Sequence, residues 1–128
     1  MTEHSPVTTD DFINNRCRYI AWGSSGAPIV EGDTFLPQAL AGHSDKTVHF
    51  FGTFGGATIE LEGSNDPLAA TDPGSASWVT LKNAIGTDLS ATDNTLEVII
   101  ENPIYIRPKI TGGSSVSLQV VVCARIVR

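Results

Sequence analysis

Hydrophobic and polar residues alternate with a period of two along most of the chain after residue 45. Val48, Phe50 and Phe54 fall on one face of an extended segment over residues 46–54, and Phe51 falls on the other face. Such alternation is typical of a β-strand with one buried face. A Gly-Gly pair follows directly and supplies positive φ at little steric cost, so the pattern predicts a tight hairpin into a second strand.

The same criterion predicts further strands, each bounded by Gly, Pro, Asn or Asp. Pro108 removes a backbone donor and therefore predicts an edge or bulged strand. No window of 11 or more residues keeps a helical period with capping residues. These short strands indicate an all-β fold, a single antiparallel β-sandwich of jelly-roll-like form. The predicted strands are residues 16–22, 34–36, 46–54, 57–62, 77–81, 96–101, 104–107 and 115–127.

The first part of the chain has a different composition. Residues 1–11 are polar and contain a proline, so we assign residues 1–15 to an extended N-terminal arm and residues 16–128 to the sandwich domain. Residues 23–40 are rich in glycine and proline, which predicts a long loop. A long ordered loop in a domain this small usually has a function.

Composition and charge narrow the class of protein. The chain has 128 residues, 14 acidic and 8 basic, with a net charge of −6. This acidity argues against nucleic acid or an anionic membrane as a partner. The first 80 residues hold ten acids and three bases (10 − 3, a net of −7), and the rest hold four and five (a net of +1). Charged residues make up only 17%, against about 25% in typical soluble domains, which suggests surface buried between subunits.

The cysteines and the chain start add little chemistry. Cys17 and Cys123 are too few for a disulfide framework and lack the spacing of a zinc site, although a single bridge between them stays open. The N-terminal residues lack the basic and apolar regions of a secretory signal, and no apolar run reaches the length of a membrane span. We therefore expect synthesis in the cytoplasm.

Candidate catalytic groups are few. His43 and Asp45 are the residue types of a general base and its orienting acid, but no nucleophile motif accompanies them. Glu60 and Glu62 lie two apart on one strand face, a spacing that any exposed sheet face produces. We predict that the protein is not an enzyme.

Metal and cofactor motifs are equally weak. Asn65, Asp66 and Asp72 supply oxygen atoms of the kind calcium prefers, without the spacing of a calcium loop. The glycine-rich segment 52–56 lacks the Lys and the helix of a phosphate loop. His49 alternates with phenylalanines, as a surface or interface histidine would. We expect no metal and no cofactor.

A series of motifs runs in order between residues 46 and 127. This series resembles the small β-sandwich proteins of tailed-bacteriophage virions, especially capsid decoration (cement) proteins. The portion that includes Asn65, Trp78 and Tyr105 also looks like discoidin-type carbohydrate- or lipid-binding modules, but the bracketing cysteines usual in those modules are missing. The motifs are Gly52–Thr58, Leu61–Asp66, Trp78–Leu81, Glu101–Pro108 and Thr111–Gly113, followed by the terminal hydrophobic strand.

The resemblance implies a virion structural protein without enzymatic activity. Such a protein would bind the outside of a phage capsid, bridge neighbouring copies of the major capsid protein and form a homodimer or homotrimer. It would be made in the host cytoplasm and would end on the capsid exterior. Two other functions stay open: a discoidin-like carbohydrate- or receptor-binding module, and a phage tail or baseplate component.

The candidate partner-binding residues are aromatic. Phe51 lies on the strand face opposite Phe50 and Phe54, so it either packs under the loop over residues 23–40 or meets a partner. The full candidate set is Phe12, Trp22, Phe35 and Phe51.

Overall fold

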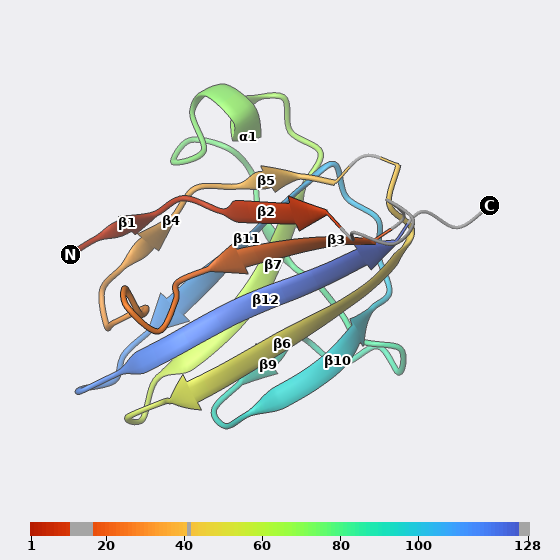
Figure 1. The fold of residues 1–128 in the computed structure, drawn as a ribbon. Helices are drawn as coiled ribbons and strands as arrows, with labels where there is room; N and C mark the ends of the chain where they lie inside the picture. Colours follow the sequence, from red (N-terminus) through yellow and green to blue (C-terminus); the bar gives the residue numbers. More distant parts are fainter. Residues whose placement is uncertain (11–16, 41, 126–128) are drawn as a thin grey trace.

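The structure is a computed structural model that describes residues 1–10, 17–40 and 42–125. It is all-β, with 50% strand and 3% helix, which confirms the all-β part of the predicted fold class. Two five-stranded antiparallel sheets lie one behind the other in Figure 1. The elements are β1 (Glu3–His4), β2 (Val7–Asp10), β3 (Cys17–Trp22), β4 (Thr34–Phe35), β5 (Gln38–Ala39), β6 (Asp45–Thr53), β7 (Thr58–Ser64), α1 (Leu68–Thr71), β8 (Val79–Thr80), β9 (Ser90–Ala91), β10 (Thr95–Ile99), β11 (Tyr105–Thr111) and β12 (Ser117–Arg125).

The sheet nearer the viewer in Figure 1, here called the front sheet, has the strand order β10-β6-β12-β3-β2. The sheet behind it, the rear sheet, has the order β5-β11-β7-β8, and β9 pairs with β7 as well. Both sheets contribute to one hydrophobic core, in which Trp22 and Phe50 of the front sheet and Ile59, Leu61 and Ile106 of the rear sheet are fully buried. Two sheets around one core are consistent with the predicted β-sandwich.

The hairpin predicted from the Gly-Gly pair is present. Strand β6 ends at Thr53 and β7 begins at Thr58, and the backbone N–H of Ala57 donates to the carbonyl of Phe54 at 2.9 Å. Gly55 and Gly56 have φ values of 57° and 82°. This left-handed geometry suits glycine because side chains with a Cβ are crowded there.

Pro108 lies within β11, opposite Leu61 of β7. On the other side of β11, strand β5 pairs only with Tyr105 and Ile106. At Pro108 the strand therefore pairs with β7 alone, which explains how proline is accommodated in a seven-residue strand.

The sequence predicts an extended arm over residues 1–15, but the described part, residues 1–10, pairs with other strands. Strand β1 pairs in parallel with β4, and β2 pairs with β3 as the edge strand of the front sheet. Two short polar strands carry too few hydrophobic positions for alternation to reveal them. An open sheet edge nevertheless offers unpaired backbone groups that even polar segments can satisfy.

The loop over residues 23–40 contains β4 where the sequence predicts a short strand, and also β5. Asp33 fastens this loop to the N-terminus, because its carboxylate accepts hydrogen bonds from the N–H groups of Thr2 and Val30, both at 2.9 Å. Its Oδ2 also lies 2.7 Å from Nε2 of His4. Burial acts to raise the pKa of Asp33, but the bonds from Val30 and Thr2 and the contact with His4 outweigh it and lower the pKa.

Candidate functional site

The surface that stands out is the side of the front sheet that faces away from the core, here called the outer front face. Residues paired across neighbouring antiparallel strands point to the same side of a sheet, so outward residues form rows across it. One row crosses all five strands and consists of Leu96, His49, Val121, Ala21 and Val7.

A second row runs beside the first, and part of a third follows. The second consists of Val98, Thr47, Cys123, Tyr19 and Thr9. In the third, Phe51 pairs with Gln119, and the ring of Phe51 lies 4.6 Å from that of His49, centroid to centroid. The three rows form a continuous surface of aliphatic, aromatic and uncharged polar side chains.

The apolar residues on this face are well exposed. Leu96 and Val7 are each 65% exposed, and Val98 and Tyr19 are each 45% exposed. Among the outward positions described on this sheet, charge occurs only at one end, where Arg125 and Asp45 pair at 2.7 Å. Contiguous apolar surface of this kind is typical of sites that other macromolecules cover.

The opposite side of the molecule is polar. On the outer face of the rear sheet, Glu62 faces Arg107 and Glu60 faces Lys109 across strands β7 and β11. Arg107 Nε donates to Glu62 Oε1 at 2.8 Å, and the guanidinium lies 4.1 Å from the centroid of the Trp78 ring. The Arg107 side chain is thus held by a carboxylate and an aromatic face together.

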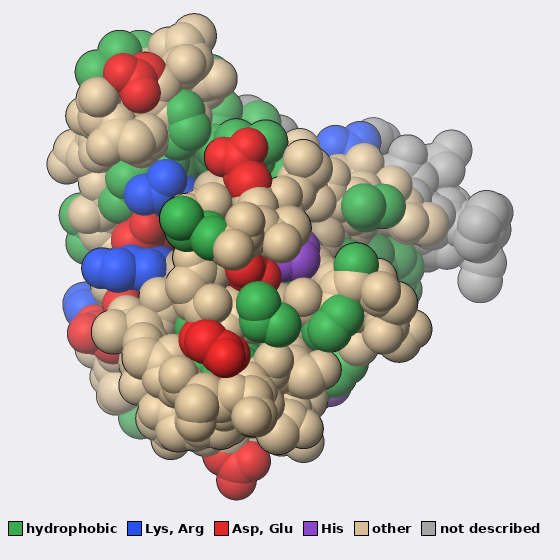
Figure 2. Space-filling view, turned by 90° about the vertical axis from the view of Figure 1, so that its left-hand side faces the viewer, with side chains coloured by type: hydrophobic (Ala, Val, Ile, Leu, Met, Phe, Trp, Pro, Cys, Tyr) green, Lys and Arg blue, Asp and Glu red, His purple; other side chains and the backbone are tan. Residues whose placement is uncertain are grey.

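A cleft of about 680 Å³, lined in part by Glu62, Arg107 and Trp78, extends toward β1 and β4. Figure 2 views the molecule from the side on which β1 and β4 lie in Figure 1, and Lys and Arg side chains gather at one edge of this view beside acidic ones. Trp78 donates its indole N–H to the carbonyl of Pro73 at 2.9 Å, and Thr80 donates to Glu60 at 3.0 Å.

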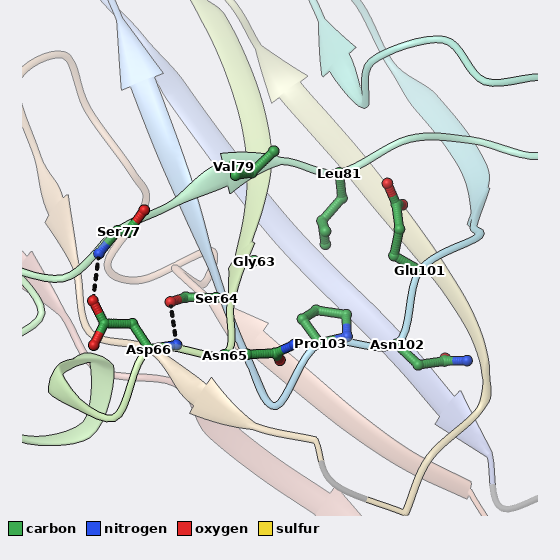
Figure 3. Close-up of a pocket in the computed structure, with 10 residues that line it drawn as sticks. All are labelled: Gly63, Ser64, Asn65, Asp66, Ser77, Val79, Leu81, Glu101, Asn102 and Pro103. Atoms are coloured by element: carbon green, nitrogen blue, oxygen red, sulfur yellow. Dashed lines mark hydrogen bonds between the residues drawn. The ribbon is translucent and has the colours of Figure 1, made fainter.

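A separate groove of about 410 Å³ lies near Gly63 (Figure 3). The side chains of Leu81 and Pro103 approach Gly63 so closely that a Cβ there would lie 2.7 Å from each. Asp66 accepts from the backbone N–H groups of Leu68 and Ser77, and these bonds lower its pKa.

The candidate catalytic residues do not assemble into a site. Asp45 pairs with Arg125 rather than with His43. The Nδ1 atom of His43 is buried and has no hydrogen-bond partner. Glu62 binds Arg107, as described above, so the two strand carboxylates hold the rear sheet together.

Two of the three candidate calcium ligands, Asn65 and Asp66, are committed elsewhere. Asn65 Oδ1 accepts from the N–H of Ile104 at 2.8 Å, and Asp66 Oδ1 accepts from the N–H of Leu68 in its own loop. Within residues 1–10, 17–40 and 42–125, no group of three or more His, Cys, Asp or Glu side chains is placed to hold a metal ion.

Lys46 is a buried amine at one end of the core, only 1% exposed. Its Nζ contacts the side-chain oxygen of Asn102 and donates to the carbonyl of His43 at 3.3 Å. Burial lowers the pKa of Lys46, while the nearby charges of Asp45 and Glu101 oppose that effect. The amine has two oxygen acceptors, which are what a buried cation requires.

The four aromatic candidates fall in different environments. Trp22 is fully buried and donates its indole N–H to the carbonyl of Leu36, and Phe35 is 5% exposed. Both belong to the core, which corrects their assignment as partner-binding residues, and Phe35 also lines the cleft near Trp78. Phe51 is half-buried on the outer front face, and Phe12 lies outside the described residues.

Most residues of the outer front face were not predicted, because the candidate partner-binding residues were chosen among aromatic residues. Their signal was the presence of hydrophobic residues on both faces of the strands over residues 96–101 and 115–127. Val121 and Cys123, for example, alternate with the buried Val120 and Val122. A strand that is apolar on both faces must be covered twice.

Comparison of the chain with protein-family models, curated proteins and solved structures finds no match. The described residues contain no helix with the length and apolar run that crossing a bilayer would require.

Proposed function

We propose that this protein is a structural component of a bacteriophage virion, one that binds the outer surface of the capsid and bridges neighbouring major capsid subunits. The observation that carries the proposal is the outer front face, where exposed apolar residues cross five strands with an ion pair only at one end. A component of a permanent assembly keeps a broad apolar surface of this kind covered by another subunit of that assembly.

The motif series between residues 46 and 127 supports the same proposal through its resemblance to phage decoration proteins. A jelly-roll-like connectivity, a homo-oligomeric state and a location on the capsid exterior are parts of the proposal. The acidic balance of the chain, −6 overall, is compatible with a position outside a shell that encloses DNA.

The test is addition of the purified full-length protein to capsids that lack it. We expect binding that saturates at a fixed number of copies per capsid, together with a higher melting temperature of the capsid. A protein that neither binds such capsids nor changes their melting temperature would contradict the proposal.

A discoidin-like carbohydrate-binding module is the second candidate. It is favoured by two clefts, of which one is lined by Trp78 and the other by the polar residues Asn65, Asp66 and Ser77. Saturable binding of the isolated protein to defined glycans, lost in Trp78→Ala, would favour this candidate over the capsid role.

A further inference from the structure

The outer front face needs a partner, and its chemistry indicates which one. We infer that it binds the same face of a second copy of this chain, so that two front sheets pack against each other. The inference deepens the proposed function and rests on it, because a permanently assembled protein keeps such a face covered. The capsid protein would then contact other surfaces of the molecule.

The distribution of charge favours the outer front face over the outer rear face for contact between two copies. Each copy carries a net charge of −6, and like charges brought within about 10 Å of one another repel at physiological salt. On the outer front face the only charged side chains described, Asp45 and Arg125, neutralise each other within one copy. Contact through the outer rear face would instead bring the charges of Glu60, Glu62 and Lys109 against their counterparts.

The rows are also complementary to themselves. Packed sheets lie about 10 Å apart with their strands within about 30° of each other. A twofold axis parallel to the middle strand, β12, places β12 against β12 and β10 of one copy against β2 of the other. Along the first row, Leu96 then faces Val7 and the larger His49 faces the small Ala21. Large side chains opposite small ones allow the two layers to interdigitate.

The area of the face lies close to the lower limit for stable dimers. The outward positions of the five strands, about 4.8 Å apart across the sheet and about 6.8 Å apart along each strand, cover roughly 500 Å² per copy. If the two sheet surfaces are treated as flat, a pair would bury about 1,000 Å². This area approaches the ~1,200 Å² at the lower end of stable interfaces.

This arrangement gives the dimer two identical outward sides. The clefts near Trp78 and Gly63 are lined by residues outside the outer front face, so they would stay accessible in both copies. A dimer of this form can contact two capsid subunits at once, which is the geometry of a bridge.

The test is sedimentation equilibrium of the full chain and of two variants that add the same charge at equally exposed valine or leucine positions. Leu96→Glu changes the outer front face, where Leu96 is 65% exposed, and Val79→Glu changes β8 of the rear sheet, where Val79 is 67% exposed. Circular dichroism and thermal unfolding verify that both variants fold.

We expect the native chain and Val79→Glu to sediment as a species of twice 13.6 kDa. In Leu96→Glu, a charge buried without a partner should weaken the dimer by about 100-fold or more. A native chain that is monomeric or trimeric, or equal weakening by the two substitutions, would overturn the inference. A monomer that still binds capsids would leave the proposed function intact, and a dimer that does not bind them would overturn that function alone.

Discussion

The two outer faces of this protein have opposite chemistry although they belong to sheets that share one core. On the rear sheet, outward positions alternate acid and base across strands, as in the pairs Glu62–Arg107 and Glu60–Lys109. On the front sheet, the equivalent positions are Leu, Val, Tyr, Thr and His. The charged groups of the rear face have partners within one chain, whereas the apolar groups of the front face are removed from water only by contact with another surface.

Stability and assembly therefore depend on different faces of the molecule. The Glu62–Arg107 ion pair on the rear face stabilises the folded chain, and its contribution depends on both partners being present. Exposed apolar residues on the front face contribute little to the folded monomer, because a largely exposed side chain removes little apolar surface from water. Substitutions on the two faces should therefore affect different measurable quantities.

The largest effect on stability is expected from Arg107→Ala. The side chains of Glu62 and Arg107 are 9% and 22% exposed, so removal of Arg107 leaves a nearly buried carboxylate without its cation and removes the stacking on Trp78. We expect a loss of about 2–3 kcal/mol, less than for a fully buried pair because Arg107 is partly solvated.

Chemical denaturation at fixed protein concentration measures this loss. Lys109→Ala is the matched control, because Lys109 lies two residues along the same strand but is exposed. It should change the free energy of unfolding by less than about 0.5 kcal/mol. Equal losses in the two variants would show that the Glu62 contact does not matter.

A smaller effect, dependent on pH, is expected from Asp33→Asn in the loop that joins β1 to the body. The pKa of Asp33 is lowered in the folded protein, so its ionised form stabilises the fold above the unfolded pKa. That stabilisation is lost as the pH falls below about 4 and through the lower folded pKa. Asp33→Asn should cost about 1–2 kcal/mol at neutral pH, because Asn satisfies the Thr2 and Val30 donors less well than a carboxylate.

Urea titrations at pH 7 and near pH 2 distinguish this account from a simple packing defect. The difference between the native chain and Asp33→Asn should shrink toward zero in acid, because protonation neutralises Asp33 as the substitution does. Glu3→Gln, which changes an exposed carboxylate on neighbouring β1, should show no such dependence. A deficit of the same size at both pH values would exclude the carboxylate as its cause.

The sequence predicted the strands that have strong alternation and clear turn residues. The hairpin between β6 and β7 is the best example, because Gly55 and Gly56 fix the turn and Phe50 and Ile59 fix the buried face. Strands β1 and β2 were not predicted, since their pairing depends on sheet edges contributed by residues distant in sequence.

The candidate site was predicted only in part for a similar reason. An aromatic residue in a loop or near a strand end can face either way, and Trp22 and Phe35 both face the core. Phe51 was correctly placed on the strand face opposite the buried Phe50, because its neighbours alternate. The outer front face itself depends on the lateral order of five strands, and that order brings Leu96 and Val7 into one row although 89 positions separate them in the chain (96 − 7).

We infer above that the outer front faces of two copies pack against each other across a twofold axis parallel to β12. Val121 lies at the middle of the first row, so its two copies should face each other across the axis. The most direct measurement is cross-linking of Val121→Cys, in a chain where Cys17 and Cys123 are replaced by Ser, with a bis-maleimide whose reach is about 8 Å, within the ~10 Å spacing of packed sheets. If the two front sheets pack in this way, Val121→Cys should form a covalent dimer at micromolar concentration, and Val79→Cys in the same background should form none. Cross-linking at neither position, or equally at both, would contradict it.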